Sequence, residues 1–381
     1  MKHQRAVRAF VESIDAQTVM KDVSAPKQSN TVSGRLVGDL LAGSWRNPAP
    51  SLSGDELERI APLLLRSGAG GLAWSAIRGS DLSGSPVADL FQATYRMQSL
   101  QSALHERSLK KVIPALRSAG VDPLLVKGWA IARLYPEPGM RPYIDLDLCV
   151  LPGDYSRAAE ALKSSECQDC NVDLHQGFGK FYDRRTDDIF ARSRLVKLGE
   201  VDIRVLGAED DLRFLCMHLL RHGAMFPIWL CDIGVLLERR GDNFDWDRCL
   251  SGSRRESDWV ACAIGLANQL LGVNIEGTPV IGRAENLPGW FLPAVLEQWG
   301  STAQSRGQLA PLLNSPRRIV RELFRELPHH WPNPIEASVA LGAPFNRAPR
   351  LPLQIGHVIS RAATLLMDLF RWQQTGIQQK G

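Results

Sequence analysis

The chain has 381 residues, where one domain usually takes about 150, so we expect two packed lobes or one lobe with extensions. Its 44% apolar and 23% charged residues exclude collagen-like, wholly disordered and porin-like classes. The 45 basic and 41 acidic residues leave a net charge of +4, which does not favour a long nucleic acid as partner. Seven cysteines, an odd number in so long a chain, favour the reducing cytoplasm over a secreted disulfide framework. No apolar run is long enough to predict a membrane span.

The N-terminal part of the chain has the pattern of helices. Residues 1–33 are basic and polar and lack the apolar run of a signal peptide, so we expect a flexible segment there. From 34 to 119 apolar residues recur every three to four positions, which predicts a helical region. Within it, Ser53 and Glu56 form a capping-box signature, and 87–116 is a long amphipathic helix.

The pattern changes at Gly120, and residues 120–206 read as a compact core with both strands and helices. Short apolar or alternating runs bounded by glycine and proline predict the strands. The expected elements are strands over 121–126, 143–150 and 172–175, helices over 130–135 and 152–165, and a hairpin over 196–205 that turns at Gly199. This predicts a small sheet of the α+β type within a mainly helical chain.

The remainder of the chain is helical again. Residues 207–281 are expected to form a helical region that closes a cleft, and 282–381 a C-terminal helical extension. A proline- and glycine-rich stretch, 331–352, reads as a connection inside that extension. The expected helices are 209–222, 228–240, 246–250, 258–271 with a stop at Gly272, and 356–373.

Asp145 and Asp147 are the residues most suggestive of chemistry. Two positions apart on an expected strand, they project to the same side of it. Two such carboxylates repel each other when buried, which favours either a bound divalent cation or solvent exposure. Oxygen ligands of this kind suit Mg²⁺ or Mn²⁺. A third acid, Asp173, lies on the next expected strand and would complete a two-metal site for phosphoryl transfer.

Three residues around these strands could bind phosphate. Gly128 follows an apolar strand, and its turn lets backbone N–H groups approach phosphate oxygens without a Cβ in the way. Lys127 and Arg141 would add positive charge against the charge that develops on the phosphates. For Arg141 a structural salt bridge is an equal alternative.

Two segments resemble those of a known family. The run from Leu124 to Tyr135 has an apolar strand, Lys-Gly and a helix that ends at a tyrosine, and 141–150 reads Arg-Pro-x-x-Asp-x-Asp-Leu. Both resemble the uncharacterised nucleotidyltransferase family of the DNA polymerase beta-like superfamily. Val-Asp-Leu-His at 172–175 resembles the family's third-acid strand, and the likeness extends over about 34–353.

The resemblance implies a sheet of the polymerase beta palm type and a metal-dependent nucleotidyltransferase. The enzyme would transfer a nucleoside monophosphate from an NTP, expected to be ATP, to a hydroxyl or phosphate of a small molecule, peptide or protein, and release pyrophosphate. Asp145 and Asp147 would hold both Mg²⁺ or Mn²⁺ ions. Asp173 would bind the catalytic ion and help to deprotonate the acceptor, while Lys127 and Gly128 would position the triphosphate.

One departure from the superfamily's pattern, and a second candidate for the third acid, leave alternatives open. Many relatives carry Gly-Ser at the phosphate turn, but here Trp129 follows Gly128, so the hydroxyl is missing. This supports a catalytically weak nucleotide-binding or regulatory module with the same fold; a tailoring enzyme of a peptide natural-product pathway is a further possibility. Asp202, in the expected hairpin, is a second candidate for the third acid.

Other candidate ligands give weaker signals. His218 and His222 lie one helical turn apart and could pack, line the nucleotide or acceptor cleft, or bind a metal. Asp232 could pair with either histidine across helices. Cys167 and Cys170 have zinc-like spacing, but no second pair lies nearby, so the spacing is read as incidental.

Overall fold

The structure is a computed structural model that describes residues 27–46, 50–178, 183–301 and 331–378. Most of the N-terminal segment for which flexibility is expected lies outside these residues, but from Lys27 onward the chain is helical, in α2 (Lys27–Leu41). The last part of the segment 1–33 therefore belongs to a helix rather than to a tether. Among the described residues no helix is both long and apolar enough to cross a membrane.

The strands form one five-stranded mixed sheet, which confirms the α+β class. The strand order is β3-β2-β1-β5-β4. Strand β1 pairs antiparallel to β2 and parallel to β5, β2 is parallel to β3, and β4 is antiparallel to β5. The strands are β1 (Leu124–Leu125), β2 (Leu146–Val150), β3 (Val172–Gln176), β4 (Arg194–Leu198) and β5 (Val201–Val205).

Alternation along the strands sends side chains to two differently covered faces of the sheet. On one face Leu148 and Ile203 pack with the C-terminal half of α5 (Ala88–Ser118) and with α7 (Tyr155–Ala161). On the other face Leu124 and Cys149 pack with Ile189 of α8 (Thr186–Arg192) and with α9 (Ala208–Arg221). Because Asp147 is two residues from Cys149 on β2, it belongs to this second face.

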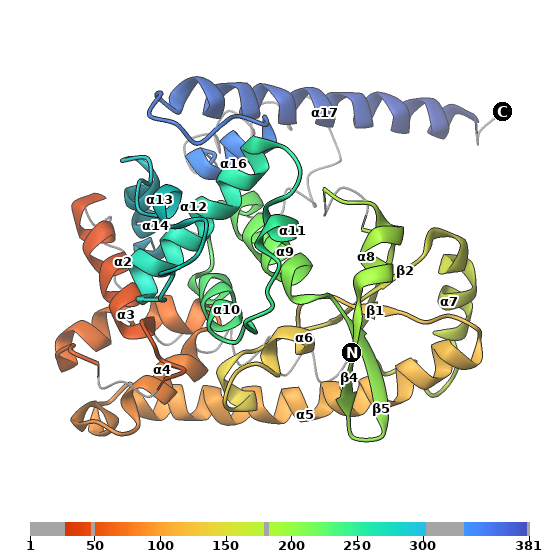
Figure 1. The fold of residues 1–381 in the computed structure, drawn as a ribbon, viewed down its shortest axis with the longest axis horizontal. Coiled ribbons are helices and arrows are strands. Elements are labelled where there is room, and N and C mark those ends of the chain that lie inside the picture. Colours follow the sequence, from red (N-terminus) through yellow and green to blue (C-terminus); the bar gives the residue numbers. More distant parts are fainter. Residues whose placement is uncertain (1–26, 47–49, 179–182, 302–330, 379–381) are drawn as a thin grey trace.

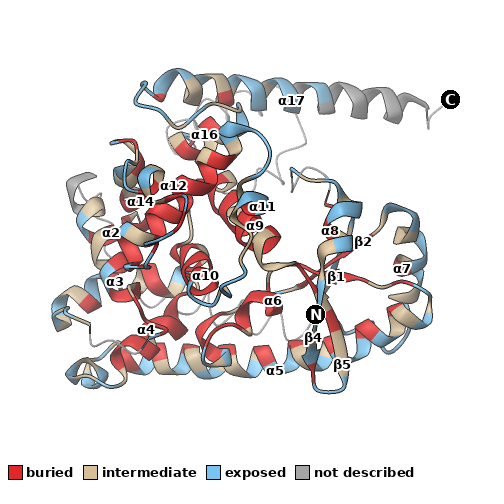
Figure 2. Cartoon of the chain, viewed as in Figure 1, coloured by how far each residue is buried: buried red, intermediate tan, exposed pale blue. Residues whose placement is uncertain are grey.

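Apart from the last helix, which runs along the outside, the other helices gather into one large apolar body beside the sheet (Figure 1). Helix α5 runs beneath both parts: its first turns pack into the helical body and its last turns into the sheet core. Buried residues are densest in α9, α10 and α12 (Figure 2). The remaining helices are α3 (Gly54–Arg66), α4 (Gly70–Ile77), α6 (Trp129–Ala132), α10 (Pro227–Glu238), α11 (Trp246–Leu250), α12 (Arg254–Leu271), α13 (Ile281–Ala284), α14 (Phe291–Gly300), α16 (Pro334–Ala340) and α17 (Leu351–Gln378), with 3₁₀ turns at Asp81–Gly84, Pro138–Met140 and Pro152–Asp154.

Local signals in the sequence are borne out where they come from a few adjacent residues. Ser53 and Glu56 form the capping box of α3, with each side chain bonded to the backbone N–H of the other. Gly272 ends α12 in the left-handed conformation, and Gly199, also with positive φ, turns the β4–β5 hairpin. The seven cysteines are all free, so Cys167 and Cys170 form no disulfide.

Several elements differ from the sequence prediction, and three differences stand out. Strand β1 has two residues instead of the six of 121–126, and β2 begins at Leu146 rather than at 143. The stretch 331–352, expected as a connection, contains helix α16. That helix begins with Pro334 in the first turn, where its fixed φ suits a helix, and the Asn333 side chain accepts the N–H of Ile335 as a cap.

Candidate active site

The turn between β1 and α6 has unusual backbone geometry. Lys127 has a φ of 57°, which is uncommon for a residue with a Cβ, and Gly128 combines a φ of 50° with a ψ of −122°. The second combination is accessible essentially only to glycine. Such conformations are costly and are retained where the surrounding structure enforces them, often at functional sites. The turn places the Lys127 ammonium beside the first residues of β2.

Trp129, which stands where many superfamily members have serine, faces away from this turn. Its side chain is buried in the core between the sheet and α5. The indole Nε1 donates a hydrogen bond to Glu106 of α5 at 3.0 Å. The residue therefore anchors α6 to α5, and the side-chain contact with phosphate that serine would offer has to come from elsewhere.

Asp147 and Asp173 are direct partners across the parallel strands β2 and β3. The Asp147 side chain is buried and that of Asp173 is exposed. The Lys127 Nζ lies 3.1 Å from Asp147 Oδ1. The His175 Nε2 lies 3.2 Å from the same oxygen and 3.4 Å from Asp173 Oδ2. Ligand atoms of Asp147, Asp173 and His175 all lie within 4.8 Å of one another, as a metal site requires.

The charges of this cluster perturb each other. Burial opposes the ionised form of Asp147, but hydrogen bonds from His175 and Lys127 outweigh it and lower the pKa of that carboxyl. The bond to Asp147 in turn raises the pKa of His175. Burial, together with the nearby Asp147 carboxylate, raises the pKa of Asp145. Burial is the larger of these two causes, so among the described residues Asp145 differs from Asp147 chiefly in lacking a cation that offsets its burial.

Asp145 lies at the edge of the cluster rather than inside it. It occupies a bend just before β2, is half-buried, and is not among the three residues whose ligand atoms come together. The residue missing from the expected set is His175. Its signal was available in the sequence, because a residue two positions after Asp173 on a strand shares its face.

Asp202, the second candidate for the third acid, lies far from the cluster. Val126 donates its backbone N–H to the carbonyl of Asp147, which sets these two residues side by side at the end of β1. Strand β5 is parallel to β1, with Leu125 opposite Val205, so the position on this side of the sheet that is level with Val126 and Asp147 is the residue after Val205. Asp202 is therefore about four residues, roughly 13 Å, back along β5 and two strands across. It pairs instead with Lys197 of the hairpin at 3.0 Å.

Residues 53–272 match the family described as Uncharacterised nucleotidyltransferase, a match over more than half of the chain. The chain belongs to this family. No curated protein and no solved structure matches it. The matched range runs from the N-cap of α3 to the C-cap of α12 and so includes the whole sheet, the Lys127–Gly128 turn and the carboxylate cluster.

In this nucleotidyltransferase, Arg141 is tied to the helical body. Its guanidinium is buried and forms an ion pair with Asp232 of α10, 2.7 Å from Nη2 to Oδ2. The Tyr135 hydroxyl donates to the same carboxylate at 2.9 Å. These contacts correspond to the structural salt bridge considered for Arg141. They also give Asp232 two partners other than the histidines proposed for it from the sequence.

His218 of α9 and His222, the C-cap residue of that helix, form an aromatic cluster with α10. Their ring centroids lie 4.4 Å (His218) and 5.2 Å (His222) from that of Trp229. Burial, with contributions from His222 and Lys127, lowers the pKa of His218 to about 3, so this imidazole is neutral at physiological pH. Lys127 and Asp147 are among the charges that act on this imidazole. Among the described residues neither histidine belongs to a group that could hold a metal.

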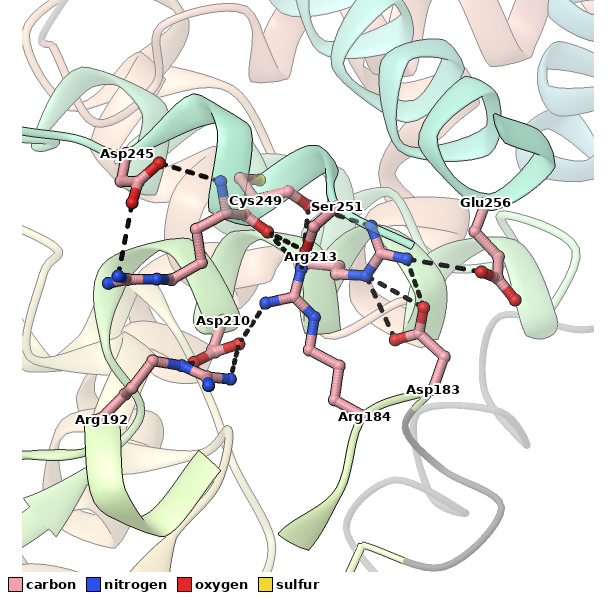
Figure 3. A network of polar contacts seen from close by, with 10 residues as sticks. Asp183, Arg184, Arg192, Asp210, Arg213, Asp245, Cys249, Ser251 and Glu256 are labelled. Carbon is pink, nitrogen blue, oxygen red and sulfur yellow. Dashed lines mark hydrogen bonds and ion pairs between the residues drawn. The ribbon is translucent and has the colours of Figure 1, made fainter. Parts of the chain in front are cut away.

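A second polar network fixes the segment after β3 to the helical body (Figure 3). Arg213 of α9 is fully buried, binds the Asp183 carboxylate in a bidentate contact and donates to the Cys249 carbonyl at 2.9 Å. Arg184 and Arg192 both bind Asp210, at 2.9 and 3.0 Å. The network borders a surface cavity of about 610 Å³ lined mainly by arginines and aspartates. It holds α8 in place over the second face of the sheet.

Proposed function

We propose that this chain is a metal-dependent nucleotidyltransferase. It transfers a nucleoside monophosphate from an NTP, expected to be ATP, to a hydroxyl or phosphate of a small molecule, peptide or protein, and releases pyrophosphate. The observation that carries the proposal is the direct pairing of Asp147 with Asp173, with Lys127 and His175 converging on Asp147. The free cysteines fit the expected reducing cytoplasm.

The residues of the site fit a divalent cation. Carboxylate oxygens are the ligands that Mg²⁺ and Mn²⁺ prefer, and Asp147 and Asp173 offer theirs within one cluster. The raised pKa of Asp145 has the Asp147 carboxylate among its causes, and this repulsion is what a cation would relieve. When bound, such ions neutralise triphosphate charge and acidify an attacking hydroxyl.

The chain's own side chains have distinct tasks in this proposal. Asp147 and Asp173 hold the ions, with Asp145 contributing from the start of β2. Lys127 presents an ammonium at the same place for the phosphates, and Gly128 allows the unusual backbone conformation of the turn, whose N–H groups would meet a phosphate. Arg141 holds the chain that leads into β2 through its contact with Asp232. It acts as a positioning residue, although its charge also reaches Asp147.

The reaction forms one bond and breaks one at the α-phosphorus. The acceptor oxygen attacks that phosphorus, and the bond to the oxygen that bridges to the β-phosphate breaks, so pyrophosphate leaves with its electron pair. Asp173 is the exposed acid of the cluster and so the one an acceptor can reach. We assign it the proton that the acceptor hydroxyl loses.

The experiment incubates the full-length protein with each NTP labelled at the α-phosphate, with Mg²⁺ or Mn²⁺, and with small-molecule and peptide fractions as acceptors. We expect label transfer by the wild type and by Asp202→Asn, and none by Asp145→Ala or Asp147→Asn. Binding of NTP without transfer by the wild type would favour the regulatory module. The absence of both metal-dependent NTP binding and label transfer would overturn the proposal.

A further inference from the structure

His175 lies between the two paired aspartates. It follows Asp173 by two residues on β3, so both side chains point to the sheet face that carries Asp147. Its Nε2 lies 3.2 Å from Asp147 Oδ1 and 3.4 Å from Asp173 Oδ2. The His175 side chain is 28% exposed, so solvent and solutes can reach the ring.

The spacing of these atoms is that of ligands around one ion. Two neighbouring ligands of an octahedral ion at about 2.1 Å lie about 3 Å from each other. The nitrogen-to-oxygen distances of 3.2 and 3.4 Å are close to this value. Asp147 Oδ1 has both Lys127 and His175 as partners, so cationic groups gather at the oxygen that would bind an ion.

The donor set also favours particular ions. Mg²⁺ is bound through carboxylates, phosphates and water, whereas an imidazole nitrogen suits divalent transition metals. A site with one nitrogen and two carboxylates is therefore a mixed set rather than an oxygen-only set. The geometry points to His175 as a metal ligand, through Nε2, that makes this site prefer a first-row transition ion over Mg²⁺. The role of that ion rests on the proposed function, but its binding can be measured without nucleotide.

The test uses Mn²⁺ as the probe, because it is a first-row transition ion that accepts an imidazole beside carboxylate ligands and is detected by electron paramagnetic resonance. Full-length protein, without nucleotide, is titrated with Mn²⁺, and pulsed measurements detect nitrogen bound to the ion. Mg²⁺ affinity is measured by competition. The variants are His175→Gln and His175→Asn, with His222→Gln as matched control, and circular dichroism checks that each variant is folded.

We expect directly coordinated nitrogen in the wild type and in His222→Gln, and none in the two His175 variants. Mn²⁺ affinity should fall at least about tenfold in those variants, with Mg²⁺ affinity changed less than about twofold. Mn²⁺ binding without a nitrogen signal in the wild type, or a signal that persists in His175→Gln, would overturn the inference alone. Equal losses for the two ions would overturn the preference. A wild type that binds neither ion would overturn this inference, and the label-transfer experiment would still decide the proposed function separately.

Discussion

Asp147 and Asp173 face each other across the parallel pair of strands β2 and β3, although a whole helix, α7, separates them in the chain. The pairing depends on register, because a shift of β3 by one residue would turn Asp173 to the face packed on α5 and α7. The correct register is fixed by Val172 and Leu174, which pack into the core on that face. The apolar alternation of β3 therefore positions the acid.

Separate substitutions of the two candidate third acids, Asp173 and Asp202, distinguish their roles. Asp173→Asn keeps the size of the side chain but removes its charge from the cluster, so nucleotidyl transfer should fall by about two orders of magnitude or more. Asp202→Asn should leave transfer within about twofold, because Asp202 contacts Lys197 on the exposed hairpin. Steady-state rates of the two variants decide this. Comparable losses in both would contradict the assignment of Asp173.

The Gly128 turn should not tolerate a Cβ. Gly128→Ala should lower the free energy of unfolding by about 2–3 kcal/mol, because φ of 50° with ψ of −122° is strained for alanine even though its Cβ would meet Asp145 O only at 3.4 Å. Gly272→Ala is the matched control: it also has positive φ but lies in the left-handed helical region with open space around it, so about 1 kcal/mol is expected. Denaturant titration measures both. Equal losses of stability in Gly128→Ala and Gly272→Ala would mean that the Gly128 turn adopts another backbone conformation without strain.

The Arg141–Asp232 pair should be strongly coupled. Among the described residues, Arg141→Met leaves the buried Asp232 carboxylate with Tyr135 as its one remaining side-chain partner, so we expect a loss of about 3–5 kcal/mol. The double variant with Asp232→Leu should recover part of this loss, with a coupling energy of about 2 kcal/mol in the double-mutant cycle. Lys163→Met, which breaks an exposed pair, should cost less than about 0.5 kcal/mol. Additive losses at Arg141 and Asp232 would contradict the coupling.

Asp211, in the first turn of α9, should make stability depend on pH. Burial raises the pKa of this carboxyl from 3.8 to about 7, although Arg194 and Arg133 oppose it, and its Oδ1 has no hydrogen-bond partner among the described residues. Between these values the unfolded chain releases a proton that the folded chain keeps. Stability therefore falls as pH rises through this window and stays low above about pH 7.

Asp211→Asn removes this effect. Relative to wild type it should gain about 2 kcal/mol more stability at pH 8 than at pH 5, measured by denaturant titration. Asp242→Asn, at an exposed position, is the control and should show no such difference. An equal gain at both pH values would mean that Asp211 is ionised throughout the range.

Features set by adjacent residues could be predicted from the sequence, and features set by pairing could not. Caps, the Gly199 hairpin and the helical periodicity are local, and the structure confirms them. The strand expected at 143 begins only at Leu146, because Leu146 pairs with Val172, the first residue of β3, and Asp145 has no partner there. The alternation of polar and apolar residues that predicted a strand from 143 therefore extends further than the backbone pairing between β2 and β3.

Buried charge was the feature least accessible from the sequence. Arginine is rarely buried, so nothing in the pattern around Arg213 indicates a fully buried guanidinium. Its partner Asp183 and the shared acid Asp210 come from different segments of the chain. Such a network forms only when α8, α9 and α11 pack together, and Figure 3 shows their residues Arg192, Arg213 and Cys249 near one another.

The central claim is that this site transfers a nucleotide rather than a phosphate. The most direct measurement compares ATP labelled at the α-phosphate with ATP labelled at the γ-phosphate, with wild-type protein, a divalent cation and the acceptor fractions. The account predicts that the α label moves to an acceptor, that the γ label appears in pyrophosphate, and that Asp147→Asn abolishes both. Transfer of the γ label to an acceptor would contradict the account.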